Sequence, residues 1–332
     1  MKTIIPLSAL IQSFFTERLI NQRQASPHTI ASYRDSFRLL FRFALSQLNK
    51  PPSQLTLQDL DGPFIGNFLN HVETHRHNGV RSRNLRLTAI RSFFQYVAFQ
   101  EPASSAHIQR VLAIPTKRPD RPLIDFLTRS EIDALLAAPD KATWAGRRDQ
   151  TLLMLAIQTG LRLSELIGLR RHDIALGVGA HVRCHGKGRK ERCTPLTKQT
   201  VIVLKAWLQE RGGSPEEAVF PNARGAHLSP DGVQYLLAKH VATAQKTCPS
   251  LTKKRISPHV LRHTAAMELL QAGVDRSVIA LWLGHESVET TQIYLEANLA
   301  LKEKALAKTK PLHVKTGRYR PSDSLLRFLN TL

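Results

Sequence analysis

One stretch without periodic pattern, residues 101–125, divides the sequence into two parts that both show helical periodicity. Four prolines lie within it, and each removes a backbone donor and restricts the residue before it, so we expect an extended linker. At 332 residues, each part is long enough to bury a core of its own. The sequence therefore predicts a helical domain over residues 1–105, a linker over 106–124 and a second domain over 125–332, with a tail over 298–332.

The first 100 residues predict a bundle of helices. Ser26 and Pro27 form a helix start, with Ser at the N-cap and Pro at the first helical position, and an apolar stripe continues to Leu48. A second helix is expected over about 57–75, where Gly62-Pro63 breaks the first part, and a third over about 82–99. The residues before Leu19 predict an amphipathic helix rather than a signal peptide.

Arginines punctuate the third predicted helix without acidic residues among them, so ion pairing at i,i+4 does not account for them. We interpret them as contacts to phosphate; the alternative is a solvated helix face. They are Arg81, Arg83, Arg86 and Arg91.

The second part predicts a mainly α fold with a small antiparallel β-sheet. The best strand candidates, HVRC and ERCTPL, flank GKGR, whose glycines permit a tight turn, so a hairpin is expected over 181–196. Helices are expected over about 128–138, 147–159, 201–211, 231–244, 259–272, 276–283 and 288–297.

The charge balance narrows the choice of partner. The chain carries 47 Lys and Arg against 26 Asp and Glu, a formal net charge of +21. Such an excess predicts salt-dependent binding to a polyanion, with a ribosome-associated protein or a merely solvated basic surface as alternatives. Three cysteines imply no disulfide framework and fit a reducing cytosol. No run of residues is long and apolar enough to span a bilayer.

A spaced series of basic side chains that ends in a tyrosine has the groups needed for catalysis. Two guanidiniums can clamp a phosphate, a lysine and two imidazoles can move protons, and a tyrosine hydroxyl can form a covalent intermediate. This is what phosphodiester transfer requires when no metal or other cofactor takes part. The residues are Arg162 in TGLRLSEL, Lys187 in HGKGRKER, His259 and Arg262 in SPHVLRH, His285 in LGHES, and Tyr294 in TTQIYLEA.

Two neighbours of this series have open readings. Glu165 is either a carboxylate that holds a catalytic base or arginine in place, or an exposed helix residue. His263 follows His259 at i,i+4, so the pair could form half of a zinc site, but no carboxylate or cysteine is placed to complete it. A core histidine with a satisfied hydrogen bond is the alternative for His263.

The order and spacing of the series resemble the tyrosine recombinase (phage integrase) family, whose signature is Arg, Lys, His-x-x-Arg, His or Trp, then Tyr. All six positions are filled here. The resemblance implies a two-domain, C-shaped DNA clamp with a helical, SAM-like core-binding domain before the catalytic domain. It also implies site-specific DNA recombination, in which strands are cleaved and rejoined through a covalent 3′-phosphotyrosine without metal or ATP.

The resemblance assigns a role to each position. Arg162, Arg262 and His285 would bind the scissile phosphate and stabilise charge that develops on its oxygens. Tyr294 would attack phosphorus and leave a free 5′ hydroxyl. Its proton must go to an acceptor, and His259 is the best placed one.

Lys187 would donate a proton to the departing 5′ oxygen, and Lys190 is the competitor for that role. Arg189 and Lys190, with Arg183 and Arg192 nearby, would form a loop that probes DNA.

The expected partners are double-stranded DNA recombination sites, bound by a homo-tetramer on two sites, alone or together with a related recombinase. We expect work in the bacterial cytoplasm, at the nucleoid, and no membrane association. The resemblance is to XerC/XerD-like or transposon-encoded recombinases, and integration, excision and multimer resolution all stay open. The rival functions are a type IB topoisomerase-like nicking-closing enzyme, against which the separate first domain argues, and a non-catalytic DNA-binding accessory protein, against which the six-residue set argues.

The last ten residues, DSLLRFLNTL, form a second apolar pattern after the tyrosine. A helix so short and apolar needs a surface to bury it. It would pack either on its own domain or on a neighbouring protomer.

Overall fold

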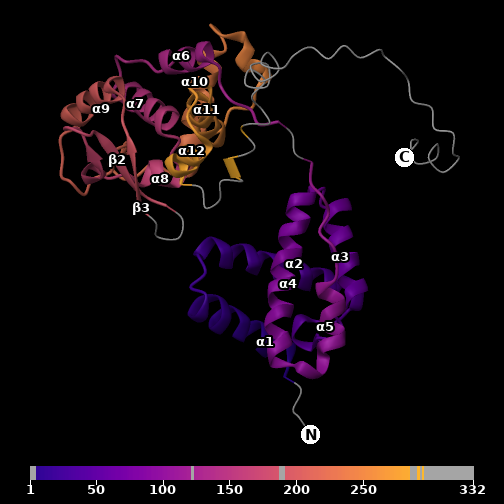
Figure 1. Ribbon diagram of the computed structural model, residues 1–332. Helices are drawn as coiled ribbons and strands as arrows, with labels where there is room; N and C mark the ends of the chain where they lie inside the picture. The colour runs from indigo at the N-terminus through magenta and orange to yellow at the C-terminus, as the bar shows by residue number, and fades with distance from the viewer. Residues whose placement is uncertain (1–4, 121–122, 187–190, 285–289, 292–293, 295–332) are drawn as a thin grey trace, which may run out of the picture. The chain divides into compact units, whose positions relative to one another are not determined.

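Two units divide the chain in the computed structural model, residues 1–121 and 122–332. The structure describes residues 5–120, 123–186, 191–284, 290, 291 and 294 (Figure 1). Both units are mainly helical, and the second contains a small antiparallel sheet, so the predicted fold class is confirmed.

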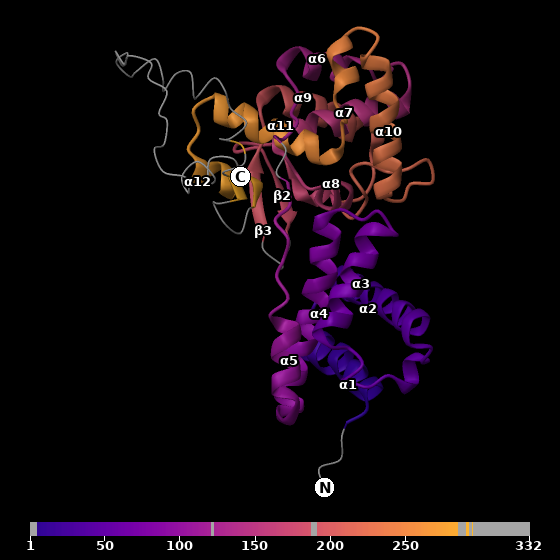
Figure 2. The same ribbon diagram turned by 90° about the vertical axis from the view of Figure 1, so that its right-hand side faces the viewer.

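The first unit is a bundle in which α4 contacts α2, α3 and α5. Figure 2 shows α4 beside α3 and α5. Ser26 caps α2 as predicted, because its side-chain oxygen accepts a hydrogen bond from the backbone N–H of Thr29. The helices are α1 Leu7–Ser13, the π-helical η1 Phe14–Gln22, α2 Pro27–Leu48, α3 Gly62–Thr74, α4 Val80–Gln100 and α5 Ser105–Leu112, with 3-10 turns η2 Pro52–Gln54 and η3 Pro102–Ser104.

One expectation about the first unit was wrong. The segment expected to be a linker from residue 106 contains α5, which buries Ile108 and Val111 in the core of this unit. This helix is short and lies between prolines, so the sequence did not reveal it. The second predicted helix begins at Gly62, where the sequence placed a break, and the Asp61 carboxylate caps it by accepting from the N–H of Phe64 at 2.7 Å.

Aromatic side chains from three elements meet in the core of the first unit. The ring of Phe93 on α4 lies 5.5 Å from that of Phe14 and 5.4 Å from that of Phe37, both edge-on. All three rings are buried. Edge-to-face packing of this kind joins η1, α2 and α4 and fixes their relative positions.

The second unit packs helices around α7, which contacts α9 and α11. The predicted capping box at Thr128 and Glu131 begins α6, and Gly160 ends α7 in the left-handed conformation as expected. The helices are α6 Arg129–Ala137, α7 Trp144–Thr159, α8 Leu163–Gly168, α9 Lys198–Arg211, α10 Pro230–Ala244, α11 Pro258–Gln271 and α12 Arg276–Leu283, with 3-10 turns η4 Arg171–Asp173 and η6 Pro249–Lys253.

The sheet has the order β1-β2-β3, with β1 Ile174–Ala175, β2 His181–His185 and β3 Glu191–Pro195. The predicted hairpin is confirmed by the antiparallel register of β2 and β3, in which His181 pairs with Pro195 and Arg183 with Cys193. The sequence did not predict β1, because a strand of two residues is too short to show an alternation of apolar and polar side chains. Most of the helix expected over 288–297 lies outside the described residues.

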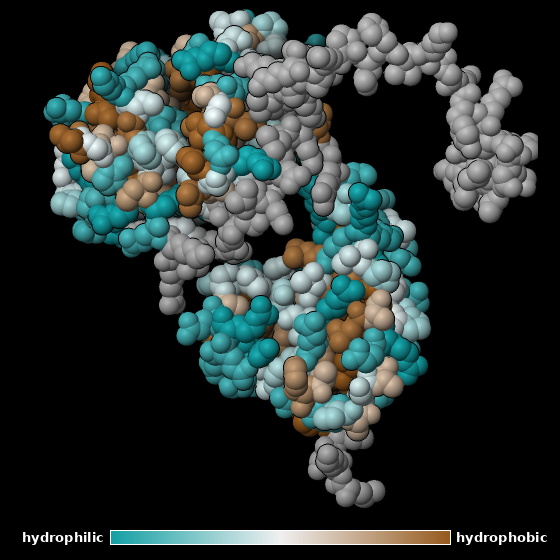
Figure 3. All heavy atoms as spheres, in the orientation of Figure 1, coloured by the Kyte–Doolittle hydropathy of each residue, from teal (hydrophilic) through white to brown (hydrophobic). Residues whose placement is uncertain are grey.

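Hydrophilic side chains of both units surround smaller hydrophobic areas on the face drawn in Figure 3. None of the helices in the described part of the chain has the length and apolar character needed to cross a membrane.

The buried position of Phe93 predicts that its removal destabilises the first unit and leaves the second unit unchanged. Phe93→Ala should lower the free energy of unfolding of the first unit by about 3–5 kcal/mol, since it opens a cavity in the aromatic core. Phe99, on the same helix but 81% exposed, supplies the control, and Phe99→Ala should change stability little. All three tryptophans lie in the second unit, so its unfolding can be followed by fluorescence while circular dichroism reports both units. A fluorescence transition that shifts as far as the dichroism transition would contradict this.

Candidate active site

Arg162 is held at the start of a helix by its own first turn. It is the N-cap of α8, and its backbone N–H donates to Glu165 Oε2 at 2.7 Å. Its guanidinium donates through Nη1 to Glu165 Oε1 at 2.9 Å and through Nη2 to the carbonyl oxygen of Gly284 at 2.8 Å. The guanidinium is therefore oriented by protein atoms on two elements while its side chain stays 31% exposed.

Glu165 is the carboxylate that orients this arginine. It is 7% exposed, and both of its oxygens also accept from Arg192, at 2.9 and 2.7 Å. Burial raises the pKa of Glu165, but hydrogen bonds from Arg192 and from the Arg162 backbone outweigh it and hold the pKa below its ordinary value. Of the two sequence readings, the structure supports the carboxylate that holds an arginine in place.

Arg262 lies deep in α11, 6% exposed. Its Nη1 donates to the carbonyl of Gly160 and its Nη2 to that of Leu283, each at 2.7 Å. Burial, and then the nearby positive charge of Arg162, lower the pKa of Arg262 to about 10, which leaves it charged at neutral pH. His259 is exposed on the first turn of the same helix.

Two glycines, Gly160 and Gly284, let the backbone come close enough to the arginines for their carbonyls to accept hydrogen bonds. Gly160 has φ +64°, and a Cβ there would lie 2.6 Å from Cδ2 of Leu283. Gly284 has φ +66°, and a Cβ there would lie 2.9 Å from Nη1 of Arg192. Both positions require the left-handed backbone and leave no room for a side chain, which explains the glycines in TGLR and LGHE.

Tyr294 is 2% exposed, and its hydroxyl lies 3.1 Å from Nδ1 of His263. The two rings meet edge-on with centroids 5.6 Å apart. Burial raises the pKa of Tyr294, although the charge of Arg262 acts in the opposite direction. Burial also lowers the pKa of His263, helped by the neighbouring His259 and Arg262. A neutral imidazole therefore faces a protonated phenol.

His263 is thus a contact of Tyr294. The sequence alone allowed two other interpretations of His263, a core histidine or half of a zinc site. The i,i+4 spacing could not reveal the partner, because Tyr294 is 31 residues away. Within the described ranges, no three His, Cys, Asp or Glu side chains gather in a way that could hold a metal ion.

The structure brings Arg162 and Arg262 onto adjacent carbonyls, those of Gly284 and Leu283. The charge of Arg262 acts to lower the pKa of the buried Tyr294, against the effect of burial. Lys187 and His285 lie outside the described residues, as do Arg189 and Lys190. The elements that lead to them, β2, β3 and the turn at Gly284, are described.

The arginines of α4 have partners within the first unit. Arg83 is 5% exposed, with Nε 3.6 Å from Glu73 Oε2 and Nη1 bonded to the carbonyl of Pro115 at 3.3 Å. Arg86 donates to Ser36 Oγ at 3.1 Å, and Arg91 to the carbonyl of Ile114. These contacts hold α2 and the segment after α5 against α4. Arg81 is exposed.

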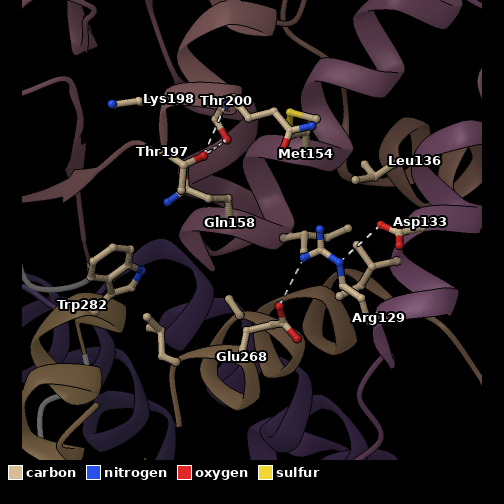
Figure 4. A pocket seen from close by; sticks show the side chains of 15 residues that line it. Arg129, Asp133, Leu136, Met154, Gln158, Thr197, Lys198, Thr200, Glu268 and Trp282 are labelled. Atoms are coloured by element: carbon tan, nitrogen blue, oxygen red, sulfur yellow. Dashed lines mark hydrogen bonds and ion pairs between the residues drawn. The ribbon is translucent and has the colours of Figure 1, made fainter. Parts of the chain in front are cut away.

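An apolar cavity of about 540 Å³ opens in the second unit (Figure 4). Arg129 lies beside it and pairs with Asp133 at 3.5 Å and with Glu268 at 3.6 Å. Side chains of α6, α7, α11 and α12 form its apolar lining, namely Ile132, Leu136, Met154, Ile157, Ala265, Leu269 and Trp282. Polar and charged side chains complete its lining, namely Arg129, Asp133, Gln158, Thr197, Lys198, Gln199, Thr200 and Glu268. A concave surface with so large an apolar share is typical of one that receives another segment.

Comparison with known proteins covers both units. The model described as "Phage integrase family" matches residues 125–300, and that described as "Phage integrase, N-terminal SAM-like domain" matches residues 12–101. A Sinorhizobium fredii protein, y4rC, whose name describes it as an integrase/recombinase, is 61% identical over 326 residues, which cover 98% of each chain. Tyrosine recombinase XerC of Myxococcus xanthus is 34% identical over 300 residues, 87% of this chain and 93% of that one.

Solved structures share the fold. The XerH recombinase bound to palindromic difH substrate superposes with a TM-score of 0.71 at 22% identity, over 86% of this chain and 81% of that one. The Tn1549 transposon integrase in complex with a circular intermediate DNA gives 0.67 at 15% identity, over 90% and 99%.

The buried carboxylate of Glu165 predicts a pH-dependent stability. Because the folded state lowers its pKa, its contribution is complete above the ordinary value of 4.5 and is lost as the pH falls through the folded value. Glu165→Gln should therefore lower the free energy of unfolding of the second unit by about 3 kcal/mol at pH 7, and the difference from wild type should shrink in acid.

Denaturant unfolding followed by tryptophan fluorescence measures this effect. Glu216, which is 68% exposed and pairs with Arg170 at 2.7 Å, gives the control Glu216→Gln, with an expected change below about 1 kcal/mol. A loss at Glu165 that stays constant from pH 7 down to pH 3 would show that its charge is not the cause.

Proposed function

We propose, from the premise that this chain belongs to the phage integrase family of tyrosine recombinases, that Tyr294 is its nucleophile and that Arg162 and Arg262 clamp the scissile phosphate. The chain is a site-specific recombination enzyme that cleaves and rejoins DNA. The observation that carries the residue assignment is that the two guanidiniums bind adjacent carbonyls, those of Leu283 and Gly284, and that the charge of Arg262 acts on the buried Tyr294.

The two arginines are suited to bind a phosphate because protein oxygens, three carbonyls and one carboxylate, set their geometry. Arg262 uses one N–H of each terminal nitrogen on Gly160 and Leu283, and Arg162 uses its terminal nitrogens on Glu165 and Gly284. An arginine carries more N–H donors than these, so donors are left for phosphate oxygens. Such fixed donors stabilise negative charge in the transition state at little reorganisation cost.

The proposed reaction takes its residue roles from the family signature. The Tyr294 oxygen attacks phosphorus, the bond from phosphorus to the 5′ oxygen breaks, and a 3′-phosphotyrosine forms. The phenolic proton goes to His259 and the leaving 5′ oxygen receives a proton from Lys187, with His285 as a further phosphate ligand. Burial favours the protonated phenol, so an acceptor is needed. Attack by a 5′ hydroxyl on the phosphotyrosine reverses these steps and rejoins a strand.

The hydroxyl of Tyr294 is buried and lies 3.1 Å from Nδ1 of His263. His263 is therefore a direct contact of the proposed nucleophile.

The partners are double-stranded recombination sites, which supports a place in the bacterial cytoplasm. XerH and the Tn1549 integrase are bound to DNA in the structures that share this fold. The proposed phosphate contacts are Arg81, which is exposed at the start of α4, Arg189 and Lys190. Arg83, Arg86 and Arg91 already bind other residues of the first unit, so a phosphate would have to use the N–H groups that these bonds leave over.

The working assembly is a homo-tetramer on two sites, joined by the last ten residues. We assign residues 323–332 of a neighbouring copy to the apolar cavity of the second unit. The segment offers apolar side chains of matching character, at Leu325, Leu326, Phe328, Leu329 and Leu332. The segment and the cavity are different surfaces of the same chain, so the contact is heterologous and can close into a ring.

Tyr294 is tested with a nicked suicide half-site. The wild-type chain should form a covalent adduct that mass spectrometry locates at Tyr294, and Tyr294→Phe should form none. Tyr235→Phe removes a phenol that is 75% exposed and should leave adduct yield unchanged. An adduct on another residue would end the assignment.

The tail is tested by deletion of residues 323–332. The shortened chain should unfold with the same midpoint and bind a single site normally, but its yield of two-site complexes should fall several-fold, because each protomer loses one neighbour contact. Native mass spectrometry or gel mobility of synaptic complexes measures the yield. Normal yield would refute the exchange of tails.

A further inference from the structure

Arg192 stands in the segment that the sequence assigned to a DNA-probing loop, yet its side chain is turned into the protein. It lies on β3 and is 12% exposed. Its Nη1 and Nη2 donate to the two oxygens of Glu165 at 2.9 and 2.7 Å, and its Nε donates to the carbonyl of Trp282 at 3.1 Å. All three nitrogens of the guanidinium are therefore engaged with α8 and α12.

The contact with Trp282 is one of three at the same helix end. Successive carbonyls at the end of α12 accept from three arginines: Trp282 from Arg192, Leu283 from Arg262 and Gly284 from Arg162. The last carbonyls of a helix lack partners within it and carry the negative end of the dipole. A cation at each satisfies them and fixes the end of α12 relative to β3, α8 and α11.

Two of the three arginines, Arg192 and Arg162, share a single buried carboxylate. Glu165 receives both arms of Arg192 and one arm of Arg162. Because Arg192 binds both carboxylate oxygens in the plane of its fork, it fixes the rotation of the carboxylate and leaves Arg162 only one oxygen for its side chain. Without Arg192, Glu165 would keep only its contacts with the backbone N–H and Nη1 of Arg162, so a single residue would orient the carboxylate.

We propose that Arg192 is a positioning residue for Arg162: by fixing Glu165 and the end of α12, it keeps phosphate-binding donors of Arg162 free and aimed. The inference rests on the proposed role of Arg162 as a phosphate clamp. Arg192 itself does not touch DNA; it acts through Glu165 and through the carbonyl next to those that hold Arg262 and Arg162.

The test compares cleavage of bound DNA with binding. Full-length Arg192→Ala and Arg192→Lys are measured on a suicide half-site under single-turnover conditions at saturating protein, and duplex affinity is measured by gel shift at fixed salt. Arg192→Ala should slow cleavage about 10- to 100-fold, the range for loss of a group that orients a functional residue. Its affinity should stay within about threefold, since many other phosphate contacts supply binding. Arg192→Lys keeps the charge without the fork and should recover only part of the rate.

A matched control separates positioning from stability. Arg171 also donates to a carbonyl at a helix end, that of Leu208 in α9, at 3.1 Å, and it is remote from Glu165 in the contacts described. Arg171→Ala should cleave at the wild-type rate. Tryptophan fluorescence checks that each variant is folded at the assay temperature, and Arg192→Lys carries the test if the alanine variant is not.

A double-mutant cycle decides whether Arg192 acts through Arg162. If it does, Arg192→Ala should slow the Arg162→Ala enzyme by less than about threefold, although it slows the wild type strongly. Equal effects in both backgrounds, or wild-type cleavage by Arg192→Ala, would overturn the inference. Wild-type cleavage by Arg162→Ala alone would instead overturn the proposed phosphate clamp, so the two failures are distinguishable.

Discussion

The end of α12 is the point on which the site depends. Three guanidiniums approach its last carbonyls, and repulsion among them is offset by one buried carboxylate, Glu165, and by the negative end of the helix dipole. The lowered pKa of Arg262 records this crowding together with its burial. Arg162 and Arg192 share Glu165, and all three arginines bind successive carbonyls of one helix end, so a change at one of them alters the environment of the others.

Backbone shape makes such crowding possible. Gly160 ends α7 and Gly284 ends α12, both in the left-handed conformation, and each brings a carbonyl to an arginine. Arg162 follows Gly160 by two residues, so the cap of one helix also places the start of α8. The site is thus assembled from helix ends, where carbonyl and N–H groups are free to meet side chains.

The first unit uses arginines differently. Arg83, Arg86 and Arg91 bind a carboxylate, a hydroxyl and main-chain carbonyls from other segments, and so hold the bundle together along α4. A basic residue on a helix can thus serve the fold even where no acidic residue lies near it in sequence. The high net charge of the chain supports attraction to DNA, but it does not identify the residues that touch it.

The sequence by itself determined the fold class, most helices, the β2–β3 hairpin and the family, because period, caps and motif spacing are local properties of the chain. It missed α5 and β1, which are too short to be recognised from a period alone, and it placed Arg192 beside a loop that would probe DNA. Only the tertiary structure decided that Glu165 also binds Arg192, and that His263 faces Tyr294. Those pairings join residues brought together from different helices and strands, so the packing of the second unit, rather than any local pattern, selects each partner.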